Sequence, residues 1–106
     1  QHIAQLMQNR GHITALDLGE LRLRRMQDFL AASGVNIVEC IHADGMSWGK
    51  RGLRGTFDRV LVDAPCSASG LWPRLDWARL TPEGVEELAK QQFALLATAA
   101  REVRPG

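Results

Sequence analysis

The sequence has few of the features that mark secreted, membrane or metal-binding proteins. Its two cysteines, Cys40 and Cys66, are 26 positions apart, which makes neither a disulfide framework nor a CxxC metal site. No apolar run is long enough to span a membrane, and no signal peptide is recognisable. We therefore expect a reduced, cytoplasmic protein that has no metal ion and does not contact a membrane.

The charge is close to balanced, with a net charge of +1 over 106 residues. This value is too small to indicate nucleic-acid binding by itself. Three basic residues, Lys50, Arg51 and Arg54, gather in the stretch "WGKRGLRG". They could contact phosphates, although a solvated loop is the simpler interpretation.

The hydrophobic pattern predicts alternating helices and strands. Helices are expected over residues 1–10, 20–33 and 82–104, and strands over 12–17, 36–41 and 59–63. Thr81 suits the N-cap of the last helix, Pro82 its first position and Gly34 the end of the second helix. On the last helix, one face is expected to combine Val85, Leu88, Gln92, Leu95, Ala99 and Val103. Such alternation is typical of an α/β fold whose parallel sheet is covered by helices.

Three aspartates follow the three expected strands. Asp17 ends the first strand, Asp44 follows the second and Asp63 ends the third. In open parallel sheets, ligands bind beyond the carboxyl ends of the strands, where a carboxylate can accept hydrogen bonds from ribose hydroxyls or from an adenine amine. Aspartate is also common in turns and at helix N-caps. Three acids in equivalent places favour an adenosine compound, without separating a nicotinamide dinucleotide from S-adenosylmethionine.

One stretch carries a specific resemblance. "DRVLVDAPCSASG" resembles motif IV of the Nop/Sun family of RNA cytosine-C5 methyltransferases, whose pattern is Asp-Ala-Pro-Cys-Ser followed by small residues. "ITALDLGELRLRRMQDFLAASG" resembles the second strand and helix of the family, "HADG" its third-strand acid motif, and the stretch from Leu80 to Gly106 the helix before its fifth strand. The likeness covers nearly the whole chain.

The resemblance implies part of a single Rossmann-like catalytic domain that uses S-adenosylmethionine, with the first and fifth strands missing. Asp17 would hold the ribose hydroxyls, Arg22 would lie near the same pocket, and Asp44 would contact the adenine. Asp63 would lie between the cofactor and the target base, and contribute to both cofactor binding and catalysis. The substrate would be a cytosine in RNA, most often ribosomal RNA in bacterial members. The parent protein is expected to be monomeric.

The resemblance also implies a role for Cys66. In this family the attacking thiolate comes from a second cysteine after the fifth strand, expected beyond residue 106, and the motif IV cysteine promotes product release. In DNA cytosine-C5 methyltransferases the Pro-Cys motif supplies the nucleophile itself, but the Ser-Ala-Ser-Gly that follows Cys66 favours the RNA family. Cys40 lies in a strand pattern and is expected to be a small buried residue. Without the nucleophile and the glycine-rich cofactor loop, the excerpt is expected to be inactive alone.

The stretch "LWPRLDWARL" departs from the family pattern and looks shorter than usual. Trp72, Arg74 and Trp77 could stack on RNA bases, or the tryptophans could pack the last helix onto the sheet. Three other functions remain open: a methyltransferase acting on nitrogen, a non-catalytic RNA-binding or assembly domain, and a dehydrogenase. Ala64 and Cys66 argue against the first, and a dehydrogenase gives no reason for Pro-Cys-Ser.

Overall fold

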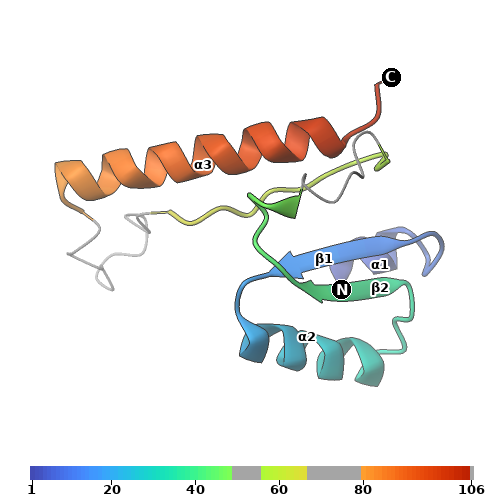
Figure 1. Ribbon diagram of the computed structural model, residues 1–106. Helices are drawn as coiled ribbons and strands as arrows, with labels where there is room; N and C mark the ends of the chain where they lie inside the picture. The colour runs from blue at the N-terminus through green and yellow to red at the C-terminus, as the bar shows by residue number, and fades with distance from the viewer. Residues whose placement is uncertain (49–55, 67–79, 106) are drawn as a thin grey trace. The chain divides into compact units, whose positions relative to one another are not determined.

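The computed structural model describes residues 1–48, 56–66 and 80–105. The chain divides into two compact units, Gln1–Ser47 and Trp48–Gly106, referred to as the first and second unit. The helices and strands, in chain order, are α1 (His2–Leu6), β1 (Ile13–Asp17), α2 (Glu20–Ala32), β2 (Val38–His42) and α3 (Pro82–Glu102) (Figure 1).

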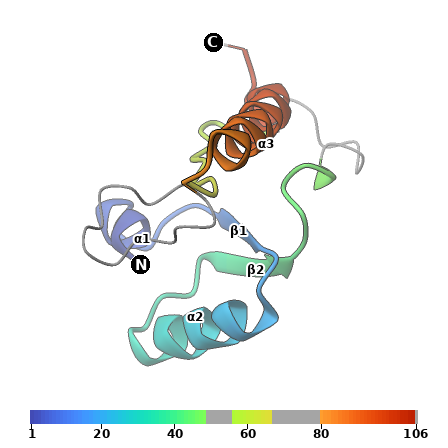
Figure 2. The same cartoon turned by 90° about the vertical axis from the view of Figure 1, so that its left-hand side faces the viewer.

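The first unit is built around a strand–helix–strand repeat. β1 and β2 pair in parallel, with Ile13 beside Val38 and Asp17 beside His42. A parallel pair requires a crossover connection, and α2 supplies it. Figures 1 and 2 show α2 running alongside both strands, and its buried residue Leu23 lies two turns before a second one, Leu30. The predicted α/β arrangement is confirmed in this unit.

The N-terminal helix is shorter than the sequence pattern predicts. α1 ends at Leu6 because Gln8 and Asn9 take left-handed backbone conformations, with φ of 54° and 55°. The Asn9 side chain then ties together the loops that lead into the two strands. Its Oδ1 accepts from the Asn36 N–H at 3.3 Å, and its Nδ2 donates to the Gly34 carbonyl at 3.4 Å.

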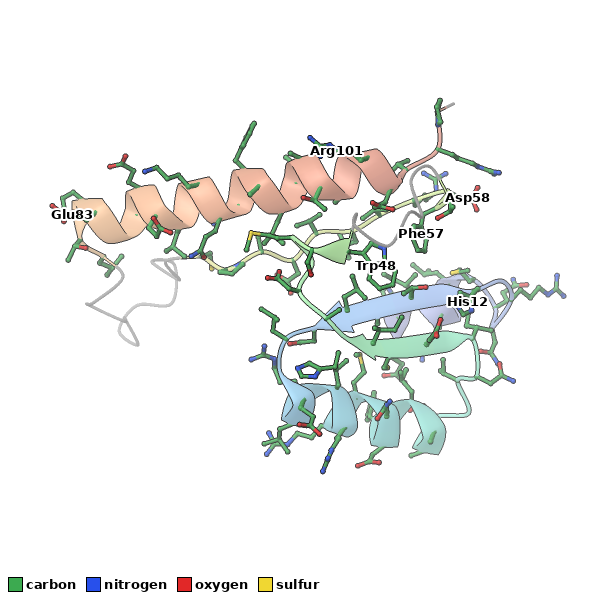
Figure 3. The ribbon with its side chains drawn as sticks, in the orientation of Figure 1. His12, Trp48, Phe57, Asp58, Glu83 and Arg101 are labelled. Carbon is green, nitrogen blue, oxygen red and sulfur yellow. The ribbon has the colours of Figure 1, made fainter. Side chains whose placement is uncertain are left out.

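The predicted N-terminal cap of α3 is confirmed in the second unit. The Thr81 hydroxyl accepts from the Gly84 N–H at 3.0 Å, a cap that typically stabilises a helix by about 1 kcal/mol. At the other end of α3, Phe57 forms a single parallel bridge with Val103. The Phe57 N–H donates to the Glu102 carbonyl, and the Arg104 N–H donates to the Phe57 carbonyl. Figure 3 labels Phe57 and its neighbour Asp58.

The predicted strand over residues 59–63 is wrong for this structure. Residues 58–66 contain no strand, and the β-type pairing of the segment is limited to the bridge at Phe57. A parallel strand needs hydrogen-bonding partners along its length. Within the described part of the second unit, backbone partners for this segment are found next to Val103 alone.

The predicted face of α3 is partly confirmed. Its half-buried members are Leu88, Gln92, Leu95 and Ala99, and Val103 just beyond the helix is half-buried too. Val85 is an exception, because 48% of it is exposed. Two further apolar residues of the helix, Phe93 and Leu96, are exposed as well. No helix in the described ranges is long and apolar enough to cross a membrane.

Candidate functional site

Asp17 is the centre of a hydrogen-bonded cluster at the carboxyl end of β1. Its Oδ1 accepts from the Gly19 N–H at 2.7 Å and from Arg22 Nη2 at 2.6 Å. Arg22 Nε lies 3.1 Å from both carboxylate oxygens. The arrangement is local, because Gly19 is the N-cap of α2 and Arg22 lies on its first turn. Asp17 and Arg22, which the resemblance placed near one pocket, therefore form a direct pair.

The cluster keeps Asp17 ionised. The hydrogen bond from Arg22 lowers the pKa of the Asp17 carboxyl below its usual range, the Gly19 N–H lowers it further, and partial burial opposes them. The same pair raises the pKa of Arg22. An ionised carboxylate only accepts hydrogen bonds, so the partner that suits Asp17 is a donor such as a hydroxyl. Both side chains reach solvent, which screens their attraction.

The Asp17 carboxylate fits one ribose hydroxyl as it stands. Oδ1 already accepts from the Gly19 N–H and from Arg22 Nη2, and Arg22 Nε also lies 3.1 Å from it. Oδ2 has one donor, Arg22 Nε at 3.1 Å. A carboxylate oxygen has two lone pairs, so Oδ2 has room for one more donor. A second hydroxyl would require the exposed Arg22 guanidinium to move aside. The residues present therefore fit the ribose of S-adenosylmethionine.

His42 belongs to the same edge and was missed by the sequence analysis. Its ring Nε2 donates to the Leu18 carbonyl at 2.8 Å, which fastens the end of β2 to the loop that follows β1. It also makes a smaller contribution to lowering the pKa of Asp17. The feature that could have identified His42 is the register of the two strands, because it places His42 directly beside Asp17. The sequence analysis noted "HADG" but used only its aspartate.

Asp44 shapes a turn after β2. Its Oδ1 accepts from the Met46 N–H at 2.9 Å, and its carbonyl accepts from the N–H and the hydroxyl of Ser47. One carboxylate oxygen of Asp44 therefore stabilises a turn, which is the common structural role of aspartate in loops. Within the described residues, Oδ2 has no hydrogen bond, so a contact to an adenine amine stays a prediction that the geometry permits.

Asp63 and Cys66 lie in the extended segment of the second unit, and both are exposed. Neither cysteine of the chain is in a disulfide. The Pro65 carbonyl, directly before Cys66, accepts from Gln92 Nε2 on α3 at 2.6 Å. Cys40 differs, because it is half-buried in β2 and burial raises the pKa of its thiol. A raised pKa keeps a thiol protonated and unreactive at neutral pH.

The predicted RNA-contacting residues lie outside the described residues. They are Lys50, Arg51, Arg54, Trp72, Arg74 and Trp77. Within the ranges that the structure does describe, no group of three His, Cys, Asp or Glu side chains could hold a metal ion.

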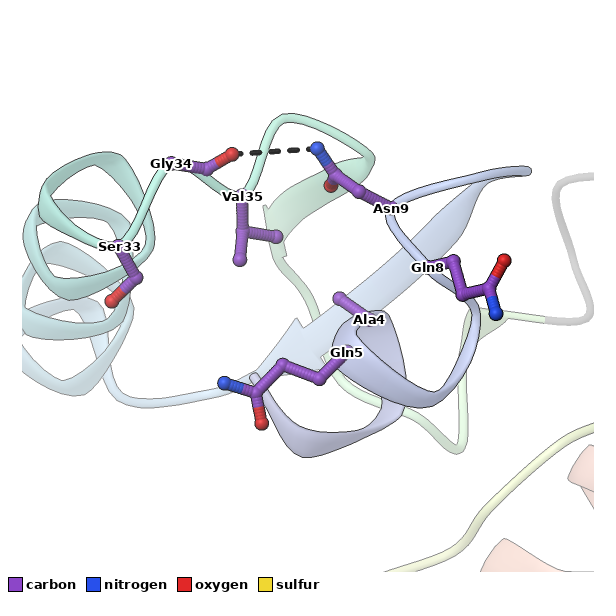
Figure 4. A pocket seen from close by; sticks show the side chains of 7 residues that line it. All are labelled: Ala4, Gln5, Gln8, Asn9, Ser33, Gly34 and Val35. Atoms are coloured by element: carbon purple, nitrogen blue, oxygen red, sulfur yellow. Dashed lines mark hydrogen bonds between the residues drawn. The ribbon is translucent and has the colours of Figure 1, made fainter.

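A groove of about 250 Å³ in the first unit is not part of the candidate site (Figure 4). It is lined by Ala4, Gln5, Gln8, Asn9, Ser33, Gly34 and Val35. These residues precede the two strands, so the groove lies at the edge where the strands begin. Asp17 and His42 lie at the opposite edge, where the strands end.

The whole chain matches a family of known proteins. Residues 1–106 match the family model described as 16S rRNA methyltransferase RsmB/F. The chain belongs to this family. The resemblance to the Nop/Sun methyltransferases is thereby confirmed.

Two curated relatives illustrate the family. The tRNA (cytosine(72)-C(5))-methyltransferase of Pyrococcus horikoshii is 36% identical over 105 residues, which cover 99% of this chain and 26% of the relative. The ribosomal RNA small subunit methyltransferase F of Aeromonas hydrophila is 35% identical over 106 residues, covering 98% of this chain and 22% of the relative. The chain thus spans about a quarter of the length of these relatives.

Solved structures confirm the fold as part of a Rossmann-like methyltransferase. NSun6 from Pyrococcus horikoshii, solved with SFG, is 36% identical with a TM-score of 0.86, and the match covers 99% of this chain and 27% of that one. A methyltransferase homolog protein from the same organism is 32% identical with a TM-score of 0.82, covering 99% and 32%. The roles of the individual site residues stay predictions.

Proposed function

We propose that this chain is the part of an RNA cytosine-C5 methyltransferase that binds the adenosine of S-adenosylmethionine and resolves the covalent RNA adduct. Family membership supports RNA methylation. The Asp-Ala-Pro-Cys segment supports the choice of cytosine C5. The activity belongs to the full-length protein, since the chain matches about a quarter of its relatives.

Cytosine C5 is a poor nucleophile, so the reaction needs covalent help. A thiolate that adds to C6 makes C5 electron-rich enough to take a methyl group. S-adenosylmethionine would supply that methyl group as an electrophile. A base must then remove the C5 proton; the electron pair of the C5–H bond restores the C5–C6 double bond, and the thiolate leaves C6.

Each candidate residue has a place in this scheme. Asp17 accepts from the ribose of the cofactor, with Arg22 and His42 holding the carboxylate and its loop, and Asp44 accepts from the adenine. Asp63 lies by the N3 and N4 edge of the cytosine and favours the protonated, activated ring. The attacking thiolate belongs to a second cysteine outside this chain, and Cys66 promotes loss of the C5 proton.

The observation that carries the proposal is the contrast between the two cysteines. Cys66 is exposed directly after Asp-Ala-Pro, whereas Cys40 is half-buried with a raised pKa. A thiol that acts on a bound base has to be accessible, as Cys66 is, and burial makes a thiol less reactive. The use of S-adenosylmethionine is further supported by the NSun6 structure solved with SFG, an analogue of it.

Ribosomal RNA is the proposed substrate. The description of the matching family names 16S rRNA, and the name of one relative refers to the RNA of the small ribosomal subunit. Another relative is described by cytosine 72 of a tRNA. Bisulfite mapping of total RNA from cells with and without the gene tests this. Loss of one or a few 5-methylcytosines in 16S rRNA is the expected result; loss in tRNA would change the substrate, and no loss in any RNA would contradict cytosine-C5 methylation.

A further inference from the structure

The carbonyl of Pro65 is held from α3 by the side chain of Gln92. Gln92 Nε2 donates to it at 2.6 Å, across 27 positions of sequence and within the second unit. This carbonyl belongs to the peptide unit that joins Pro65 to Cys66. A hydrogen bond to it therefore fixes the plane from which the Cys66 backbone and thiol extend.

The segment has little else to hold its backbone. Residues 59–65 form no strand, and no other hydrogen bond among the described residues reaches their backbone. Pro65 has no N–H, so its carbonyl is the one backbone group through which a hydrogen bond can hold this residue. Gln92 supplies that donor from a helix of 21 residues, which is a more rigid support than a loop.

The position of Gln92 on the helix supports a specific role. It is half-buried on the face that also carries Leu88, Leu95 and Ala99. A polar amide among apolar side chains is unfavourable unless it is hydrogen-bonded. The adjacent Gln91 is also half-buried, yet its side chain makes no hydrogen bond within the described residues. The Pro65 contact is thus particular to Gln92.

We propose that Gln92 is a positioning residue for Cys66: its amide fixes the Pro65–Cys66 peptide so that the thiol can assist breakdown of the covalent RNA adduct. This inference rests on the proposed function. Gln92 itself touches neither RNA nor cofactor in this scheme. Its loss should leave formation of the adduct intact and slow its resolution.

The test uses the full-length protein and four substitutions, three on α3 and one at Cys66. Gln92→Met keeps the length of the side chain and removes the donor; Gln92→Glu keeps its shape and leaves only acceptors. Gln91→Met is the matched control on the same helix. Each variant is incubated with substrate RNA and S-adenosylmethionine. Three quantities are measured: turnover, the fraction of protein trapped on RNA in a denaturing gel, and the melting temperature. Cys66→Ala serves as the reference for an adduct that cannot resolve.

Both Gln92 variants should lower turnover about tenfold, the usual effect of one lost hydrogen bond in a positioned site. They should also raise the trapped fraction toward that of Cys66→Ala, while Gln91→Met changes neither. A drop in melting temperature and turnover without trapping would show a packing role and overturn the inference, as would Gln92 variants that behave like Gln91→Met. If Cys66→Ala itself traps no RNA, the proposed role of Cys66 fails, and that of Gln92 with it.

Discussion

The two units of the chain differ in how much of their candidate site each builds from its own contacts. In the first unit, Asp17, Gly19 and Arg22 form a hydrogen-bonded cluster at the edge of a paired sheet, and His42 separately bonds the Leu18 carbonyl at the same edge. In the second unit, residues 59–65 form no strand, and among the described residues one hydrogen bond, from the Gln92 side chain, reaches their backbone.

The two units also differ in whether their buried polar side-chain atoms are hydrogen-bonded. Within the described residues, the one side chain whose buried polar atoms lack a hydrogen bond is Glu102 of the second unit, which is only 3% exposed. An unpaired buried carboxylate is unfavourable. Among the described residues, the first unit therefore leaves no buried side-chain polar atom without a hydrogen bond, whereas the second leaves the two carboxylate oxygens of Glu102.

The largest effect is expected from a substitution of Asp63, which lies in the second unit. Asp63→Asn in the full-length protein should lower kcat/KM for RNA methylation about a hundredfold or more, because the variant cannot stabilise a protonated ring. Methyl transfer from labelled S-adenosylmethionine measures this. Asp58→Asn, an equally exposed aspartate paired with Arg104, is the control and should change the rate less than about threefold. Equal rates in the two variants would remove Asp63 from the mechanism.

A smaller effect is expected from the self-contained network of the first unit. Asp17→Asn should weaken S-adenosylmethionine binding about tenfold or more, since a hydrogen bond to a charged acceptor is lost. Calorimetry on the full-length protein measures the affinity. Asp28→Asn changes an exposed aspartate of α2 and should leave it unchanged. Unaltered affinity in Asp17→Asn would show that the cofactor binds elsewhere.

The smallest effect concerns the geometry of that network. A Cβ on Gly19 would lie 2.8 Å from Arg22 Cζ, so Gly19→Ala pushes the flexible guanidinium away from Asp17. Cofactor affinity should fall by about threefold, because losing the partner that orients the Asp17 carboxylate costs more than the freed acceptor site gains, and an exposed pair is of modest strength. Asp28→Asn again serves as the control, because Asp28 is exposed on α2 away from this contact.

The pH dependence of binding gives this variant a second readout. The pKa of Asp17 is lowered in the folded protein, so the ionised form and its contacts persist above the usual aspartate pKa and are lost as the pH falls through the lowered value. Moving Arg22 away removes the main cause of the shift. The pH at which binding is lost should therefore rise in Gly19→Ala. An unchanged midpoint would mean that Arg22 does not control Asp17.

The sequence predicted several local features well, although it made the first helix too long. The Thr81 cap and the glycine after α2 follow from residue types at the helix ends, whereas the nearness of Arg22 to Asp17 was implied by the family resemblance. Strand 59–63 was wrong because an apolar run specifies a strand only when partners lie beside it. His42 was missed because its contact to Leu18 depends on strand register, and Gln92 because its contact spans 27 positions.

The central claim is that Cys66 resolves the adduct and Cys40 takes no part in the chemistry. The direct measurement is the amount of RNA held covalently by the full-length Cys66→Ala and Cys40→Ala variants in a denaturing gel, after incubation with RNA and S-adenosylmethionine. The account predicts that Cys66→Ala accumulates a stable protein–RNA adduct while its turnover falls, and that Cys40→Ala turns over normally without one. Loss of the adduct in Cys66→Ala would instead identify Cys66 as the nucleophile, and normal turnover in that variant would remove it from the mechanism.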